Sequence, residues 1–309
     1  MNYFAVDVGG SSIKYAVMTE EMHFLKKGKA ESRHLETPEQ FIAEIKKLYE
    51  ENGCCEGGIA VSFCGETNEK TGYLYSGGSY PYLAKLNLKD MIEEACNTKA
   101  SVENDGCCAG LAESRYGTLR GYQNAAVVVI GTGLGGAIIL NGALYHGAHG
   151  YAGSASLLAR NIEVPYTKQS WSFRVTGASY PGNRYAQIKG LEPGSVDGIM
   201  FFKACEEKDP DALKVLEEYA SALANTLFNI HLILDVEAIA IGGGISQQPL
   251  LKEYVQKAFD AIYETPGMPK IGVPKPMIRI CEFHNDANLI GALSHHLNMI
   301  NTEESEKGN

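Results

Sequence analysis

The sequence AVVVIGTGLGGAIIL, at residues 126–140, decides the fold that we predict for this chain. It has two short apolar runs, separated by a turn that contains four glycines and Thr132. Apolar runs this short and this rich in β-branched residues are typical of buried strands. Glycines relax the backbone of the turn and leave its N–H groups open to an anion such as phosphate. We therefore expect a β-hairpin that faces a phosphate, with an ordinary glycine-rich hairpin as the alternative.

Three glycines of this turn also satisfy the pattern G-x-G-x-x-G, namely Gly131, Gly133 and Gly136. In a dinucleotide site, that motif needs a helix to begin inside it. Here the motif runs on into the apolar residues 137–140 and then into a tight turn at Asn141-Gly142. We therefore exclude a dinucleotide site of the Rossmann type.

The composition describes a globular protein with room for two lobes. The chain has 309 residues, of which 45% are hydrophobic and 21% charged, and its net charge of −10 disfavours a nucleic-acid partner. No apolar run approaches the roughly 18 residues that span a membrane. The N-terminus lacks the features of a signal peptide. We therefore expect a cytoplasmic protein, in which the eight cysteines are free buried thiols, without a zinc site of the usual spacing.

Residues 3–19 repeat the plan of the first stretch. A strand ends at Asp7, the turn Gly9-Gly10-Ser11-Ser12 follows, and residues 13–18 form a return strand. Such a repeat indicates an internal duplication, with two lobes that each bring a glycine hairpin to a shared cleft. We expect an N-terminal α/β lobe at residues 1–118 and a C-terminal α/β lobe at residues 119–309. The last helix, at about residues 288–298, is expected to pack back on the N-terminal lobe.

Two aspartates are candidates for chemistry. Asp7, at the end of its strand, would repel phosphate unless a cation such as Mg²⁺ lay between them; a turn-capping side chain is the alternative. Asp105 follows a short strand at residues 99–103 and lies just before a helix at about 107–116. There the helix dipole keeps a carboxylate ionised, which suits a base, although a plain N-cap needs the same residue type.

Other elements follow from periodicity and composition. We expect helices at residues 37–51, 211–234 and 288–297, and strands at 58–63 and 238–241, the latter ending in a third glycine turn that could pack against a flat base. The aromatic loop at 72–83 suits a sugar or plain surface packing, and the loop at residues 144–154, with His146 and His149, is expected to line the cleft. Residues 158–195 have no clear element and are interpreted as an insert or lid. The tail from Asn301 is expected to fray.

Four segments together resemble the sugar-kinase branch of the ROK family over nearly the whole chain. They are DVGGSSIK at 7–14, ENDGCCAGLAE at 103–113, the segment 130–153, and IAIGGGI at 239–245. The resemblance implies an actin-like, hexokinase-type (ribonuclease H-like) fold of duplicated α/β lobes around a central cleft. It also implies ATP-dependent phosphorylation of a sugar hydroxyl, with ATP and Mg²⁺ as cofactors.

The resemblance also implies residue roles. Asp105 would be the general base and Asn104 a sugar ligand. The sugar side would further include Gly65, His146 and Ser154. The phosphates would be faced by Asp7 (with Mg²⁺), Gly9, Gly10, Ser11, Ser12, Lys14, Thr132 and Gly133, and the adenosine by Gly243 and Gly244. Phosphoryl transfer asks mainly for positioning and charge neutralisation, which these residue types provide.

The chain departs from the family pattern after Gly153. The family usually continues Gly-Glu-x-Gly-His, but Ser154 stands in place of the sugar-binding Glu and Leu157 in place of the His that binds sugar and zinc. The zinc motif is also missing, so no zinc is expected. Zinc-free members that resemble β-glucoside kinases share the glycine-rich loop at residues 76–78, which favours a glucoside or a disaccharide as substrate. The full range of acceptors that we expect is a hexose, an N-acetylhexosamine or a β-glucoside.

Two other functions remain open. A non-catalytic or weakly active sugar sensor of the same family is compatible with Ser154. A transcriptional repressor is disfavoured, because the chain starts directly on the first phosphate strand and is acidic. The sequence does not identify the sugar or the hydroxyl attacked. A homodimer is the expected assembly, although no sequence feature specifies it.

Overall fold

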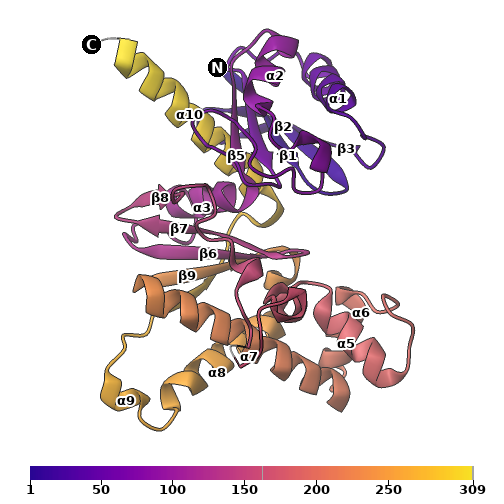
Figure 1. The fold of residues 1–309 in the computed structure, drawn as a ribbon, viewed down its shortest axis with the longest axis vertical. Helices are drawn as coiled ribbons and strands as arrows, with labels where there is room; N and C mark the ends of the chain where they lie inside the picture. The colour runs from indigo at the N-terminus through magenta and orange to yellow at the C-terminus, as the bar shows by residue number, and fades with distance from the viewer. Residues whose placement is uncertain (162, 308–309) are drawn as a thin grey trace. The chain divides into compact units, whose positions relative to one another are not determined.

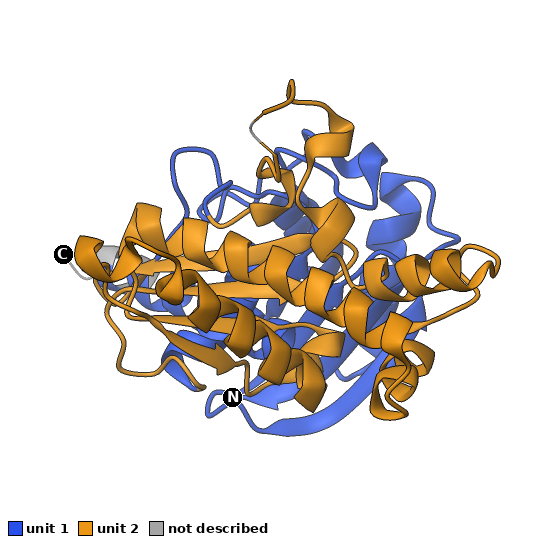
Figure 2. Cartoon of the chain, turned by 90° about the horizontal axis from the view of Figure 1, so that it is seen from below, with its two compact units in different colours: residues 1–116, 144–152, 286–309 blue, residues 117–143, 153–285 orange. Residues whose placement is uncertain are grey.

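The computed structural model describes residues 1–161 and 163–307, which divide into two compact units. Unit 1 comprises residues 1–116, 144–152 and 286–309, and unit 2 comprises residues 117–143 and 153–285 (Figure 2). The expected division after residue 118 left the loop 144–152 in the C-terminal lobe. The structure groups this loop with the N-terminal part instead.

Each unit is built on a five-stranded sheet with the same plan. Unit 1 contains β1 (Asn2–Val8), β2 (Ser12–Thr19), β3 (Phe24–Glu31), β4 (Ile59–Phe63) and β5 (Ala100–Asn104), and unit 2 contains β6 (Ala125–Ile130), β7 (Leu134–Leu140), β8 (Ala143–Tyr145), β9 (Ala238–Gly242) and β10 (Met277–Ile280). The strand orders are β3-β2-β1-β4-β5 and β8-β7-β6-β9-β10. In both, an antiparallel hairpin continues into two strands parallel to its first strand. The predicted hairpins and duplication are confirmed.

Helices complete the two units (Figure 1). Unit 1 has α1 (Pro38–Glu51), α2 (Leu88–Cys96), α3 (Asp105–Arg115) and α10 (Ala287–Lys307), and unit 2 has α4 (Phe173–Thr176), α5 (Tyr180–Lys189), α6 (Gly198–Glu206), α7 (Pro210–Leu234), α8 (Pro249–Glu264) and α9 (Met268–Ile271). The first helix begins where the sequence predicts, because Thr37 Oγ1 accepts a hydrogen bond from Gln40 N at 3.3 Å.

Different helices pack against the two faces of the unit 1 sheet. Phe41 and Ile45 of α1 are fully buried in the core that they form with the strands. Each buried side chain of this size contributes about 1.5–3 kcal/mol to stability. On the other face, α10 packs on α3 and on β1, β4 and β5. A Cβ at Gly291 would lie 1.8 Å from Cys108 O, so only glycine lets α10 approach α3 so closely.

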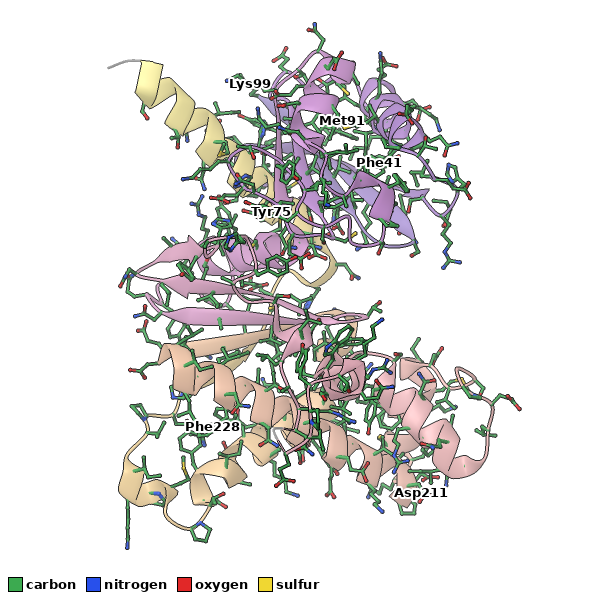
Figure 3. The ribbon with its side chains drawn as sticks, in the orientation of Figure 1. Phe41, Tyr75, Met91, Lys99, Asp211 and Phe228 are labelled. Carbon is green, nitrogen blue, oxygen red and sulfur yellow. The ribbon has the colours of Figure 1, made fainter. Side chains whose placement is uncertain are left out.

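Two expectations about the second half are wrong. Residues 158–195 contain α5, whose Tyr180 stacks on Tyr219 of the long helix α7. The sequence of α5 is polar and has no clear apolar periodicity, because this helix buries few side chains. The tail from Asn301 does not fray, since α10 continues to Lys307; residues 308–309 lie outside the described residues. In α7 and α8, Phe228 and Phe259 meet edge to face, and Figure 3 labels Phe228.

Candidate active site

The candidate residues of unit 1 lie at one edge of its sheet. Strands β1, β4 and β5 are parallel and end at Val8, Phe63 and Asn104. In sheets of this kind, ligands bind outside the carboxyl ends of the strands. The first glycine turn, the loop after β4 and Asn104-Asp105 therefore share the edge where a ligand is expected.

Asp105 is the first residue of α3, not the residue ahead of it. Asn104 is the N-cap, and its Oδ1 accepts a hydrogen bond from Cys107 N at 3.2 Å. The side-chain amide nitrogen of Asn104, Nδ2, donates a hydrogen bond to Gly65 O at 3.1 Å. The sequence-based start at about residue 107 was too late, because the cap is the asparagine and the aspartate already belongs to the helix. Asn104 keeps one amide proton and one lone pair for a ligand.

The Asp105 carboxylate is half-buried and has an unusual acidity. Burial, followed by the charge of Asp7 and then that of Glu66, raises its pKa from 3.8 to about 6, while a 2.7 Å hydrogen bond from Gly106 N acts in the opposite direction. Burial therefore has a larger effect on the pKa of Asp105 than the helix N-terminus, contrary to the expectation from the sequence. The group is ionised at neutral pH and binds a proton readily, as a general base must.

Asp7 is a buried carboxylate surrounded by donors. Its side chain is 6% exposed, and Lys14 Nζ, the partner of Asp7 in the β1–β2 register, lies 3.3 Å from Oδ2. Oδ1 accepts from Ser62 Oγ at 3.2 Å and from Asn288 Nδ2 at 3.0 Å. Three protein donors, one of them a cation, leave a poor fit for directly coordinated Mg²⁺. Asn288 comes from α10, so no local signal could have paired it with Asp7.

The first glycine turn is supported from behind by the aromatic loop. The buried Tyr80 hydroxyl lies 2.6 Å from Gly9 O, and a Cβ on Gly10 would lie 2.7 Å from Ser79 Oγ. Gly10 and Ser11 are exposed at the tip of the turn. Part of the loop that the sequence associated with sugar or surface packing therefore holds the first glycine turn in place.

In unit 2, two glycine turns lie at one sheet edge. Strands β6 and β9 are parallel, with Val129 opposite Gly242, so the turn at 131–133 adjoins Gly243 and Gly244. Gly243 has φ +95°, and a Cβ there would lie 2.0 Å from Ile130 O. Thr132 and Gly244 are exposed. The backbone groups that the sequence assigned to phosphate and to adenosine are thus neighbours.

A serine that the sequence analysis did not single out shapes this turn. Ser156 Oγ accepts a hydrogen bond from Leu134 N at 2.7 Å, and a Cβ on Gly133 would lie 2.6 Å from that oxygen. Ser154 differs, because its hydroxyl makes no hydrogen bond to any described residue. Of the predicted sugar-side residues, Ser154 belongs to unit 2, whereas Gly65, Asn104 and His146 belong to unit 1.

His146 is tied to a buried acid. Its Nε2 lies 2.7 Å from Oε2 of Glu103, which is fully buried, and His295 Nδ1 lies 3.5 Å from the same oxygen. Burial disfavours the charged imidazole, but the hydrogen bond and charge of Glu103 outweigh it and raise the pKa of His146. The pair fastens the loop 144–152 to the end of β5.

Glu103, Cys107 and His146 place three possible metal-ligand atoms within 4.8 Å of one another. The carboxylate and imidazole already satisfy each other. Burial, and then the Glu103 charge, raise the pKa of the Cys107 thiol well above its usual range. A protonated thiol is a poor ligand, so the group is better explained as a structural ion pair.

Comparisons with known proteins agree on one family. The ROK family model matches residues 3–156 and 180–297. The chain is 28% identical to a β-glucoside kinase of Listeria innocua, over 98% of this chain and 100% of that protein. It is 28% identical to a glucokinase of Halalkalibacterium halodurans, over 94% and 93% of the two chains.

A solved structure extends the comparison. A ROK family protein from Streptococcus pneumoniae, crystallised in complex with sucrose, superposes with a TM-score of 0.85 at 27% identity, over 99% of this chain and 100% of that one. The expected actin-like fold of duplicated α/β lobes is thereby confirmed. Among the described helices, none is both long and apolar enough to cross a membrane.

Proposed function

The chain belongs to the ROK family and is an ATP-dependent carbohydrate kinase, and we propose that Asp105 is its general base. The observation that carries this assignment is the half-buried Asp105 carboxylate at the start of α3, with its pKa raised to about 6. In the reaction, a sugar hydroxyl attacks the γ-phosphorus of ATP, Asp105 takes the hydroxyl proton, and ADP leaves.

The remaining residues bind and orient. We assign the acceptor sugar to Gly65, Asn104 and His146, with Ser154 adding a neutral hydroxyl. We assign ATP phosphates to the turn Gly9, Gly10, Ser11 and Ser12, to Lys14, and to Thr132 and Gly133, and adenosine to Gly243 and Gly244. Backbone N–H groups and the Lys14 ammonium stabilise the charge of the phosphates. Mg²⁺ would arrive on the ATP phosphate oxygens, because the donors around Asp7 leave little place for it there.

The substrate that we propose is a neutral sugar, either a hexose, an N-acetylhexosamine or a β-glucoside. Support comes from the relatives named β-glucoside kinase and glucokinase and from the sucrose-bound structure. A sugar sensor with weak or no activity is the second candidate. It is favoured by the uncharged Ser154, which stands where the family pattern usually has a Glu.

The deciding experiment is ADP release from ATP and Mg²⁺ with a panel of hexoses, N-acetylhexosamines and β-glucosides. We expect turnover of at least one sugar at a rate well above the sugar-free background. Sugar binding by calorimetry without turnover of any panel member would favour the sensor instead. The expected homodimer is checked on the same preparation by light scattering.

A further inference from the structure

Glu66 is a carboxylate beside the proposed base that the motifs leave without a role. It follows Gly65, whose carbonyl oxygen is bound by the Asn104 amide, and it is half-buried in the loop after β4. Glu66 is therefore one residue from a direct contact with the N-cap of the helix that begins at Asp105.

The aromatic loop holds Glu66 in place. Ser76 Oγ donates to Glu66 Oε2 at 2.5 Å, and Glu66 O accepts from the backbone N–H groups of Tyr75 and Ser76 at 2.9 and 3.3 Å. Figure 3 labels Tyr75 in this loop. The second carboxylate oxygen, Oε1, accepts no hydrogen bond from a described residue and is not enclosed. One oxygen is thus anchored, and the other can receive a proton donor from solvent or from a ligand.

Three segments of unit 1 converge around Glu66. A Cβ on Gly150 would lie 2.5 Å from Thr67 O, so the loop 144–152 packs directly against the residue after Glu66. Burial, and then the charge of Glu66, raise the pKa of Tyr151 in that loop, and the same charge raises the pKa of Asp105. Both effects require the Glu66 carboxylate to lie near these two side chains.

We propose that Glu66 binds hydroxyl groups of the acceptor sugar through its free oxygen and makes the site selective for neutral sugars. The inference rests on the proposed kinase function and names the class of acceptor that the site takes. A carboxylate accepts strong hydrogen bonds from hydroxyls. Beside Asp105, it adds a second negative charge, which disfavours sugar acids and sugar phosphates as acceptors.

The test is the isosteric change Glu66→Gln, measured with a sugar that the wild type turns over. We expect the sugar KM to rise about tenfold, with kcat within threefold and the ATP KM unchanged. The acidic limb of the kcat/KM profile should move to lower pH, because one of the charges that raise the Asp105 pKa is gone. The selectivity for the neutral sugar over its uronic acid should fall about tenfold.

Glu69→Gln is the matched control, since Glu69 is a half-buried acid of the same loop whose charge acts on His146 and not on Asp105. Equal effects of the two changes, or an unchanged sugar KM and pH limb in Glu66→Gln, overturn the Glu66 proposal while the kinase assignment stands. If the wild type turns over no sugar, calorimetry decides. Sugar binding weakened about tenfold by Glu66→Gln supports the contact, whereas unchanged binding, or no binding to the wild type, refutes it.

Discussion

The two glycine turns share a backbone plan and differ in their surroundings. In unit 1, the penultimate residue of β1 is Asp7, which is paired with Lys14; in unit 2, the penultimate residue of β6 is Val129. The last parallel strands differ as well. Strand β5 ends at Asn104 and is followed by Asp105, whereas β10 is followed by Cys281. The backbone of the turn is thus common to both units, while the carboxylates of the proposed acceptor site belong to unit 1 alone.

The substitution Asp105→Asn should have the largest effect, because it removes the proposed base of unit 1 and keeps the shape of the side chain. We expect kcat to fall about a thousandfold, because general base catalysis contributes factors of this order. ADP release measures the rate, and the exposed Asp90→Asn in α2 is the matched control. Retained turnover in Asp105→Asn would place the base elsewhere.

The unit 2 turns are tested by Gly243→Ala beside Gly244→Ala. At Gly243 a Cβ would collide with Ile130 O and φ is +95°, so we expect a loss of about 2–4 kcal/mol of stability and at least a tenfold rise in ATP KM. At Gly244 the Cβ meets nothing within 4 Å. Thermal unfolding should leave Gly244→Ala near wild type. Equal unfolding temperatures for the two variants would contradict the packing of these turns.

A pH profile tests the environment of unit 1. With the Asp105 pKa at about 6, we expect kcat/KM to be level above pH 7 and to fall about tenfold per pH unit well below 6, as the base becomes protonated. The folded state binds this proton more tightly than the unfolded chain. The group therefore stabilises the fold below its ordinary pKa, and this contribution is lost as the pH rises through 6.

Asp105→Asn should accordingly raise the free energy of unfolding at pH 8 by up to about 3 kcal/mol, because each pKa unit of the shift from 3.8 to about 6 corresponds to about 1.4 kcal/mol. Denaturant unfolding at pH 8 and at pH 4 measures the change, which should shrink at the lower pH. A kcat/KM limb near pH 4, or a variant that is less stable at pH 8, would contradict the raised pKa.

The smallest expected effect concerns Ser156→Ala compared with Ser154→Ala. Ser156 accepts the hydrogen bond of Leu134 N beside the unit 2 turn, so its loss should cost about 1 kcal/mol and raise the ATP KM two- to fivefold. Ser154→Ala should change neither the stability nor the ATP KM. The pair is compared by thermal unfolding and by initial rates at varied ATP.

Local pattern was enough for the hairpins, for α1 and for α7. Short apolar runs, glycine turns, and caps such as Thr37 depend on neighbours in the chain, so periodicity alone predicts them. Periodicity did not predict α5, because this helix packs against Tyr219, which lies far along the sequence. In the candidate site, the sequence predicted mainly the residues that belong to motifs, such as the glycine turns and the Asn104-Asp105 motif.

The sequence by itself determined the duplicated α/β fold, the two glycine turns and Asp105 as a candidate base, because each depends on a short contiguous motif. Only the tertiary structure decided what surrounds them. Asp7 is held by Asn288 of the last helix, the first turn rests on Tyr80, and Glu66 lies near Asp105. These contacts join residues far apart in the chain, and no local pattern encodes which distant side chain will be buried beside a given carboxylate or how its pKa will shift.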